Sequence, residues 1–365
     1  MFRHVLARAS EDRLLIVLLA ALAPLLFFTP ERDWALHQLV DWKTVGALAG
    51  LMILSRGLEE SGYLGLAGQW LLQRVRGERL LAIVLILFSA CLASVITNDV
   101  ALFIVVPLTL SLRQVADIPL GRLVIFEALA VNAGSALSPI GNPQNLFLWQ
   151  ASEAGFLEFT VMMAPLALAL TFLLIVIVPL AFPGKEISAS AVAADLPRER
   201  GLFWVSMLLY MPFLILADLG YAAIAPVGLV VLFLLYRRRL LLGVDWLLLL
   251  VFVLMFIDMN LLAGLPAVQD VANSLLQLPG QALTAGVLAS QIMSNVPAAI
   301  FLASFTDEWR DLAWGVSVGG FGLAIGSLAN LIALRLAREP GLWREFHYWS
   351  VPILFGGWLI AMVIS

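Results

Sequence analysis

Thr97-Asn98-Asp99 interrupts the apolar run of residues 80–112, and Ser294-Asn295-Val296-Pro297 interrupts the apolar run of residues 280–306. A second interruption follows each of them, Ser-Pro-Ile-Gly-Asn-Pro-Gln-Asn at residues 138–145 and Ile-Gly-Ser-Leu-Ala-Asn at residues 325–330. Polar side chains and broken backbone are costly in hydrocarbon unless they line a cavity or bind a ligand. Paired breaks in the two halves of a membrane protein therefore predict a transport site.

The composition places the chain among membrane proteins with several spanning segments. Of its 365 residues, 62% are hydrophobic and 13% are charged, whereas an ordinary soluble domain has about 25% charged residues. The mean hydropathy is +0.99. The net charge of −4 is small and the basic residues are scattered. We therefore expect membrane lipid as the surroundings and no nucleic acid as a partner.

Cysteine and histidine usage argues against enzyme chemistry. The single cysteine, Cys91, excludes an intrachain disulfide and a cysteine-based metal cluster. The three histidines fall at or outside the ends of apolar segments, which removes a histidine-dependent site from the membrane interior. A phosphate-binding Gly-Lys-Ser/Thr motif is also missing. We expect a protein that is not an enzyme and that uses no cofactor, with Na⁺ or H⁺ as a coupling ion.

The fold class that we predict is an all-α polytopic membrane protein built of two inverted repeats. A helix rises about 1.5 Å per residue, so residues 80–112 are too long for one crossing of a hydrocarbon core of about 30 Å. We expect a re-entrant helical hairpin there, with its polar tip near the midplane. A second hairpin at 280–306 enters from the opposite side. With one broken helix in each half, the chain has about nine spanning helices plus two hairpins.

The longest clearly polar stretch, residues 183–201, marks the boundary between the halves. The first repeat, 1–182, comprises helices at 14–28, 42–58 and 157–182, an inward hairpin at 80–112 and a broken helix at 122–149. Residues 183–217 are a linker loop and a linking helix. The second repeat, 218–365, comprises helices at 221–236, 244–262 and 348–364, an outward hairpin at 280–306 and a broken helix at 312–334. Residues 60–79 and 263–279 are expected along the two membrane interfaces.

Charge and sequence symmetry support this layout. Only Arg32, Lys43 and Arg310 of the 21 Lys and Arg residues fall on the expected outer side, which agrees with the positive-inside tendency. The N-terminus is then cytoplasmic and the C-terminus lies outside a bacterial-type inner membrane. Aligning Asn145 with Asn330 also matches Gly134 with Gly319 and Gly141 with Gly326, as an internal repeat requires.

The interruptions have the residue types that an ion or anion site needs. A hairpin tip leaves the last carbonyls of one half-helix and the first amides of the next unpaired at the same place. Carbonyls suit a hard cation, and amides at a positive helix end suit an anion. Asn, Ser and Thr complete either shell without a fixed charge, and glycine permits close approach of the backbone.

Acidic residues inside apolar segments are candidates for coupling. Asp99 is the only acid at a tip, and inserting it costs about 2.5–3.5 kcal/mol. It either carries a proton or binds a cation, or it only caps the following half-helix. Asp258 is a second coupling candidate that lies near the outer end of its helix, where it has the alternative of reaching water. We expect Glu127 to be solvated and Cys91 to be a small apolar filler.

At these motifs the chain resembles the ion transporter superfamily, which includes the arsenite pump and NhaD branch, the citrate carriers and the divalent anion:sodium symporters. The resemblance rests on residues 96–101, 139–146, 294–298 and 325–331, and it covers nearly the whole chain. It implies a dimer in which a transport domain slides against a scaffold, the elevator mechanism. It also implies Na⁺ at Asn98 with Asn145 and at Asn295 with Asn330. The full set of expected site residues is Thr97, Asn98, Asp99, Ser138, Gly141, Asn142, Asn145, Ser294, Asn295, Gly326, Ser327 and Asn330.

The resulting functional prediction is a secondary active transporter of a small anion, either an oxyanion or a carboxylate, coupled to Na⁺ or H⁺. The first tip differs from the Ser-Asn-Thr pattern of the dicarboxylate symporters and is more similar to the arsenite pump branch. The alternatives are a Na⁺/H⁺ antiporter of the NhaD type, an arsenite/H⁺ antiporter and, from another class, an ion channel.

Overall fold

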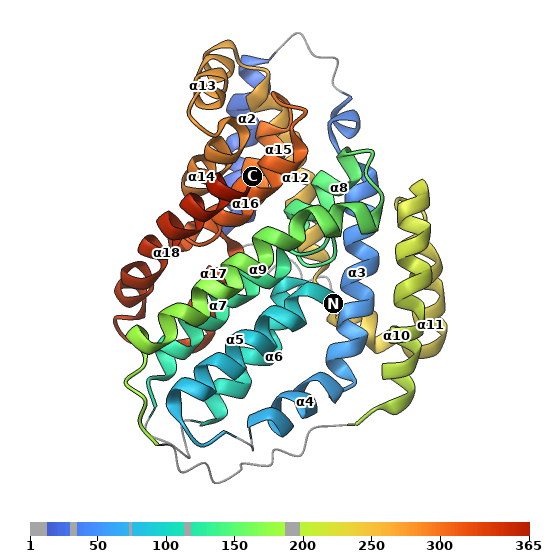
Figure 1. Ribbon diagram of the computed structural model, residues 1–365. Coiled ribbons are helices and arrows are strands. Elements are labelled where there is room, and N and C mark those ends of the chain that lie inside the picture. Colours follow the sequence, from blue (N-terminus) through green and yellow to red (C-terminus); the bar gives the residue numbers. More distant parts are fainter. Residues whose placement is uncertain (1–12, 30–34, 73–74, 113–117, 187–197) are drawn as a thin grey trace.

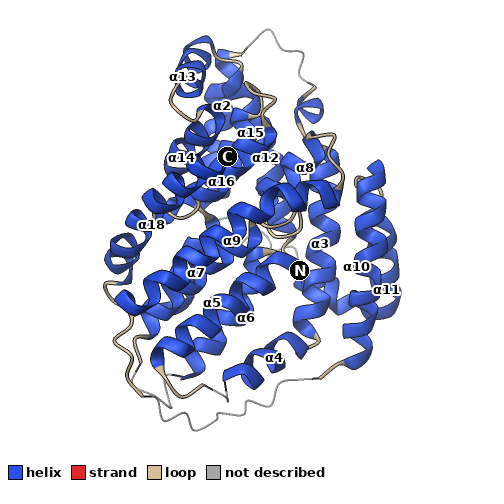
Figure 2. Ribbon diagram, viewed as in Figure 1, coloured by secondary structure: helices blue, strands red, loops and turns tan. Residues whose placement is uncertain are grey.

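The structure is a computed structural model that describes the chain except residues 1–12, 30–34, 73–74, 113–117 and 187–197. The described residues form helices and no strand (Figure 2). Extended pairing within them is limited to one isolated bridge between Gly77 and Glu186. The all-helical prediction is therefore confirmed.

Within the described part of the chain, five helices are long and apolar enough to cross a membrane: Glu78–Val95, Phe156–Ala181, Arg200–Tyr221, Trp246–Ala263 and Leu342–Ile364. Shorter apolar helices cover Leu14–Phe28, Asn98–Leu110 and Leu328–Ala337. The chain is thus a polytopic membrane protein. One of the five, Glu78–Val95, is the first limb of the expected inward hairpin, and at 18 residues it is long enough to cross by itself.

Helices break at the four interrupted motifs. Helix α5 (Glu78–Val95) is followed by α6 (Asn98–Ser111), and α7 (Leu120–Ser135) by α8 (Pro143–Ala151). Later in the chain, α14 (Gln281–Met293) is followed by α15 (Asn295–Leu302), and α16 (Trp309–Gly319) by a short turn, η4 (Ala324–Gly326), and α17 (Leu328–Ala337). Each break coincides with the polar or glycine-containing residues that cannot continue an apolar helix at low cost.

The remaining helices surround these eight. They are α2 (Arg13–Phe28), η1 (Leu36–Leu39), α3 (Trp42–Glu60), α4 (Tyr63–Leu72), α9 (Phe156–Ala181), α10 (Arg200–Leu216), η3 (Ala217–Tyr221), α11 (Ala225–Gly243), α12 (Trp246–Ala263), α13 (Pro266–Leu276) and α18 (Leu342–Ile364). Figure 1 shows α10 and α11 at one edge of the molecule and α18 at the opposite edge. The short helices α4 and α13 lie at its lower and upper ends.

Two helix pairs pack at very close range through small residues. A Cβ on Gly134 of α7 would lie 2.0 Å from the carbonyl oxygen of Ala90 in α5. In the other half, a Cβ on Gly315 of α16 would lie 2.2 Å from the carbonyl oxygen of Leu283 in α14. Such contacts exist only because these positions lack a side chain, as at many membrane helix interfaces. These contacts hold α7 against α5 and α16 against α14.

The segment that joins the two halves is fastened to helices at both of its described ends. Backbone amides of Gly184 and Lys185 donate to Oε2 of Glu78 at 3.2 and 3.3 Å, so the segment begins against α5. The amide of Glu199 donates to the carbonyl oxygen of Ser61 at 3.1 Å. The Glu199 carboxylate also pairs with Arg237 of α11. The segment therefore ends against α3 and α11.

Two expectations for single residues are wrong, and an alternative left open for a third residue does not hold. Glu127 is not solvated but fully buried, because α7 is enclosed by α5, α6, α9, α17 and α18. Asp258 does not reach water, because its part of α12 is covered and the residue is 0% exposed. Cys91 is exposed rather than a core filler. On α5 the buried residues Ala90 and Ala93 flank it and face the protein.

Candidate functional site

The first tip, residues 96–98 between α5 and α6, is bonded directly to the first broken helix. Thr97 is in an extended conformation before α6. The backbone amide of Asn98 donates to the carbonyl oxygen of Gly141 at 2.8 Å. Oδ1 of Asn98 accepts from the backbone amide of Asp99 at 2.9 Å. The amides at the start of α6 thus meet the interruption of α7 and α8.

The first break, residues 136–142 between α7 and α8, is closed by Asn142. Its Oδ1 accepts from the backbone amide of Asn145 at 2.8 Å, which caps α8. Its Nδ2 donates to the carbonyl oxygen of Ser135 at 2.8 Å. A Cβ on Gly141 would lie 2.3 Å from that same carbonyl oxygen. Ser138 donates from Oγ to the carbonyl oxygen of Ser94 at 2.8 Å, which joins the break to α5.

The second tip, residues 293–295 between α14 and α15, turns sharply at Ser294. This residue has φ 74° and ψ 157°, a region that is nearly reserved for glycine. Asn295 begins α15 and is buried. A Cβ on Gly320 would lie 3.4 Å from Nδ2 of Asn295 and 3.4 Å from Cγ of Asn132. The second tip therefore faces the second break, as the first tip faces the first.

The second break, residues 320–327 between α16 and α17, is held by Gln291 of α14. Its Nε2 donates to the carbonyl oxygen of Gly319 at 2.7 Å, and its Oε1 accepts from the backbone amide of Leu323 at 2.7 Å. Ser327 caps α17 by accepting from the amide of Ala329 at 3.3 Å. A Cβ on Gly326 would lie 2.7 Å from the Gly319 carbonyl oxygen. A side chain does not fit at this distance, so position 326 requires glycine, as position 141 does.

Asn132 joins the two halves, and the sequence analysis missed it. Its Nδ2 donates to Oδ1 of Asn330 at 2.8 Å and to the carbonyl oxygen of Gly320 at 3.1 Å. Its Oδ1 accepts from Oγ of Ser327 at 3.0 Å. Nδ2 of Asn330 also donates to the Gly320 carbonyl oxygen at 2.8 Å. The signal that could have identified it is its place as an asparagine within the apolar run of 122–137.

Several buried oxygens at the tips and breaks make no hydrogen bond within the described part of the chain. Burial without a partner costs about 1–3 kcal/mol for each such group, so a cluster of them indicates an ion, a ligand or water. The atoms belong to side chains at the second tip, in the first turn of α8 and on α16: Gln144 Oε1, Asn145 Oδ1, Ser294 Oγ and Ser317 Oγ.

Helix ends give the site its electrostatic character. Helices α6, α8, α15 and α17 all begin at a tip or break, and α5, α7, α14 and α16 all end at one. The beginnings carry partial positive charge and suit an anion, while the ends present carbonyl oxygens that suit a cation. Residues 97–99, 138–145, 294–297 and 325–330 contain no Lys or Arg. An anion here would be bound by helix ends and by a co-bound cation.

The three acids of the interior lie at different places. Asp99 is half-buried at the start of α6, where its backbone amide donates to Oδ1 of Asn98. Asp258 of α12 is buried, and neither carboxyl oxygen has a hydrogen-bond partner among the described residues. Glu127 of α7 accepts a hydrogen bond at Oε1 from the Thr109 hydroxyl of α6. Among the described residues, no hydrogen bond joins the carboxyl group of Asp99 or Asp258 to the side chains of the expected asparagines.

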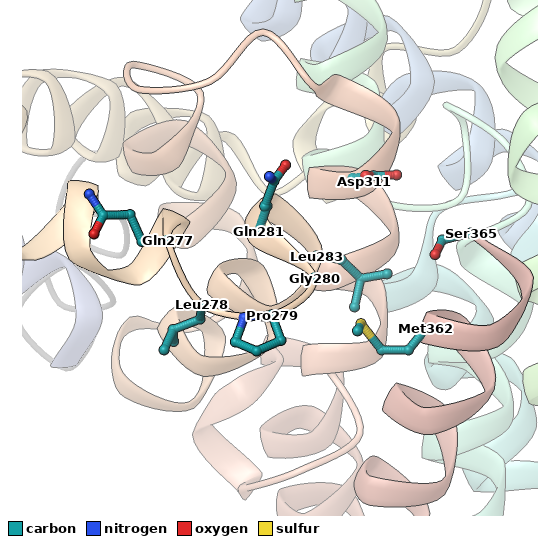
Figure 3. A pocket seen from close by; sticks show the side chains of 9 residues that line it. All are labelled: Gln277, Leu278, Pro279, Gly280, Gln281, Leu283, Asp311, Met362 and Ser365. Atoms are coloured by element: carbon teal, nitrogen blue, oxygen red, sulfur yellow. The ribbon is translucent and has the colours of Figure 1, made fainter.

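A surface pocket of about 390 Å³ lies elsewhere, between the loop after α13, the start of α16 and the end of α18 (Figure 3). It is lined by residues such as Gln277, Asp311 and Ser365. None of the expected site residues lines this pocket, so its position does not identify the transport site.

Known proteins resemble the chain over most of its length. The family model of citrate transporters (CitMHS) matches residues 9–319. Inner membrane protein YbiR of Escherichia coli (strain K12) is 43% identical over 355 residues, which are 97% of this chain and 95% of that protein. An uncharacterised transporter of Methanocaldococcus jannaschii is 33% identical over 309 residues, 82% of each chain. An uncharacterised transporter of Mycobacterium tuberculosis (strain H37Rv) is 28% identical over 343 residues, 83% of this chain and 80% of that protein.

Proposed function

Because the chain belongs to the citrate transporter (CitMHS) family of the ion transporter superfamily, and is thus a multi-pass inner membrane transporter, we propose that it carries a small anion by secondary active transport. The anion is an oxyanion or a carboxylate, and its movement is coupled to Na⁺ or H⁺. The observation that supports this proposal is that buried side-chain oxygens without partners among the described residues lie at or close to the positions where eight helices begin or end. Four of those ends are positive and suit the anion.

The proposed mechanism is alternating access of the elevator type. The two halves are inverted repeats, 1–182 and 218–365, that are joined by 183–217, and the two helix pairs α5–α6 and α14–α15 are hairpins that enter from opposite sides. The close glycine contacts of α7 with α5 and of α16 with α14 support one rigid carrier body. That body moves against a scaffold that includes α3 and α12, within a homodimer.

The expected contacts are those of the four motifs. Asn98, Asn145, Asn295 and Asn330 provide amide groups, and Gly141 and Gly326 allow the backbone to approach the ligand. Asp99 and Asp258 are the acids proposed for coupling, since an acid in a membrane interior is a functional residue by default. The burial of Glu127 adds a third candidate.

Uptake by purified protein in liposomes tests the proposal. Radiolabelled arsenite, phosphate, citrate and succinate are offered with an imposed Na⁺ gradient, an imposed proton gradient or neither. We expect gradient-driven accumulation of one of these anions. Uptake that is indifferent to both gradients would remove the coupling, and single-channel currents in planar bilayers would identify a channel.

The main alternative is a Na⁺/H⁺ antiporter. The buried acids Asp258 and Glu127 support it, because no basic side chain among the described residues is bonded to either carboxyl group. Na⁺-driven proton movement in liposomes without any added anion would favour it. An arsenite/H⁺ antiporter would instead show arsenite movement that depends on the proton gradient alone.

A further inference from the structure

Side chains from neighbouring helices hold the second break in place. Gln291 of α14 is one of them, as described above. Two residues of α18, one turn apart, bind the middle of the same break. Oγ of Ser350 donates to the carbonyl oxygen of Gly322 at 2.7 Å. Nε2 of His347 accepts a hydrogen bond from the backbone amide of Ala324 at 3.2 Å.

The two hydrogen bonds of His347 determine which ring nitrogen carries the proton. A backbone amide is a donor, so Nε2 is the unprotonated nitrogen that accepts. The other nitrogen, Nδ1, lies 2.6 Å from the carbonyl oxygen of Trp343, to which it donates. A second proton on the ring would turn both nitrogens into donors. Protonated His347 therefore cannot bind the amide of Ala324, a residue that is only 2% exposed.

His347 is accessible to protons from water. The residue is half-buried, and Arg344 one turn before it is exposed. Both lie near the start of α18, which the positive-inside layout places on the cytoplasmic side. Histidine is the side chain that ordinarily changes its charge between about pH 5 and 8. Mild acidification of the cytoplasmic side would therefore break the bond to Ala324.

The charged groups around α18 leave this bond as the main interaction of the ring. Helix α18 packs against α7, α9, α14, α16 and η4, and η4 packs against α17. The charged or titratable residues of these elements are Arg122, Glu127, Glu158, Arg310, Asp311, Arg335, Arg344, Glu345 and Tyr348. Arg122 and Glu345 pair with each other, and Asp311 lies near the other end of α18, where it lines a pocket with Ser365. No carboxylate among the described residues is bonded to His347, so none would hold the protonated ring in place.

The bond to Ala324 lies close to groups that are expected to contact the ligand. Ala324 begins η4, and η4 ends at Gly326. Ser327 follows and caps α17, whose first turn contains Asn330. Release of the Ala324 amide would therefore loosen the segment that positions these three residues.

We propose that His347 is a positioning residue of the transport site: neutral His347 holds the second break, and its protonation from the cytoplasmic side releases the break and weakens ligand binding. The inference rests on the proposed transport function and adds a regulation of the same site. The first break is held by the side chains of Ser138 and Asn142, which do not titrate. The proton therefore acts on the second break.

Hydrogen–deuterium exchange of the purified protein in detergent measures the bond without any ligand. Exchange of the peptide that contains residues 320–327 is followed by mass spectrometry at about pH 7.5 and about pH 5.5, and is corrected for the intrinsic pH dependence of amide exchange. We expect the protection of this peptide in the wild type to fall about tenfold at the lower pH, because the segment then opens more easily.

Two variants of His347 separate its charge from its shape. H347Q places an acceptor oxygen about where Nε2 lies and cannot be protonated, so protection should be high at both pH values. H347K has a permanent charge and no acceptor, so protection should be low at both.

Two further variants are matched controls. S350A removes the neighbouring bond to Gly322, so it should lower protection at both pH values and leave the pH dependence as in the wild type. H37Q changes an exposed histidine in η1, and neither protection nor its pH dependence should change.

Uptake by liposomes relates the bond to transport. The KM is measured at the same two pH values for whichever of arsenite, phosphate, citrate and succinate is accumulated. We expect the KM of the wild type to rise about tenfold at the lower pH relative to that of H347Q, with a similar maximal rate. The same change of KM with pH in both proteins would overturn the positioning role.

The outcomes separate this inference from the proposed function. Equal protection of the wild type at both pH values, or the same loss of protection in H347Q, would overturn the inference even if an anion is transported. A loss of protection that requires His347, without uptake of any of the four anions, would leave the proton-dependent bond standing and would count against the transport function.

Discussion

Glu127 has one hydrogen bond in a fully buried position, from the Thr109 hydroxyl to Oε1, while Oε2 has no partner among the described residues. A charged carboxylate without a cation is very costly in such a place. A neutral group of the same shape should therefore be accepted there. The pair of Glu127 and Thr109 also joins α7 to α6, so it contributes to the position of the first tip.

Substitutions at this pair should differ in their effects. E127Q keeps the shape and the acceptor for Thr109, so the free energy of unfolding should change by less than about 1.5 kcal/mol. T109V removes the donor and leaves both carboxyl oxygens unsatisfied, which should lower stability by about 1–3 kcal/mol. Thermal unfolding in detergent measures both. Severe destabilisation by E127Q would mean that the carboxylate is charged and that its partner lies outside the contacts described above.

Ser294 combines strained backbone with an unpartnered hydroxyl, and two variants separate these properties. S294G relieves a conformation with φ 74° that costs about 1–3 kcal/mol for a residue with a side chain, so its melting temperature should rise. S294A keeps the strain and should not be stabilised. Transport should fall in both variants because both lose the hydroxyl. An equal rise in melting temperature for S294A would contradict the assignment of strain.

At the residue scale, the sequence identified polar residues that interrupt apolar runs, but it did not show which residues are buried. Asn98, Asn145, Asn295 and Asn330 stand out because each is a polar residue in an apolar run. The structure places the first and third at the tips and the other two in the first turn of the helix that follows each break. Glu127 stood out in the same way, but we expected it to be solvated and it is buried. Its distance from a helix end does not show which neighbouring helices enclose that end. Asn132 bonds across the two halves, and Gln291 of α14 bonds to the second break; local sequence patterns do not reveal either contact.

At the scale of elements, glycines determine how closely the helices pack. In α7 the missing side chain of Gly134 lets the backbone of α5 approach, whereas a Cβ on Gly228 of α11 would meet nothing within 4 Å. G134A should therefore destabilise the protein by about 1–3 kcal/mol through overpacking. G228A should be neutral or stabilise by up to about 1 kcal/mol, because alanine favours helix more than glycine. Equal melting temperatures for the two variants would contradict the close α5–α7 contact.

The ends of several helices coincide with interruptions in the sequence, because a polar break in an apolar run is a local signal. Helix α5 ends at Val95 and α6 begins at Asn98, at the predicted interruption, and α8 begins at Pro143, where proline suits a first helical turn. Whether α5 turns back within the membrane is a different question. It depends on what surrounds an 18-residue apolar helix, and its length alone permits a full crossing.

At the scale of the whole molecule, the inverted layout predicts which loops face which side. C91S removes the single cysteine and provides a background for labelling. Glu186 and Asp307 are both exposed in loops, and E186C should react with a membrane-impermeant maleimide only after permeabilisation. D307C should react in intact cells, because the positive-inside layout places it outside. Labelling of both from one side would contradict the inverted arrangement.

The family and the membrane class could be predicted from the sequence, since both follow from composition and from motifs in a fixed order. The sequence did not predict that the two halves meet at the side-chain amide of Asn132. Asn132 and Gly320 are far apart in the chain, and their contact depends on how α7 packs against α16 and α17. Contacts of this kind result from packing of whole helices and leave no pattern in either segment.

The segment that joins the two halves is hydrogen-bonded to Glu78 of α5 at its first end and to the carbonyl oxygen of Ser61, just after α3, at its other end. It therefore links two groups of helices. Its covalent length from Lys185 to Glu199 cannot exceed about 50 Å, since a chain reaches at most about 3.3–3.6 Å per residue. In the proposed elevator mechanism, the travel of α5 relative to α3 must fit within that reach. A shorter segment would then limit how far the carrier moves without changing the residues proposed to bind the ligand.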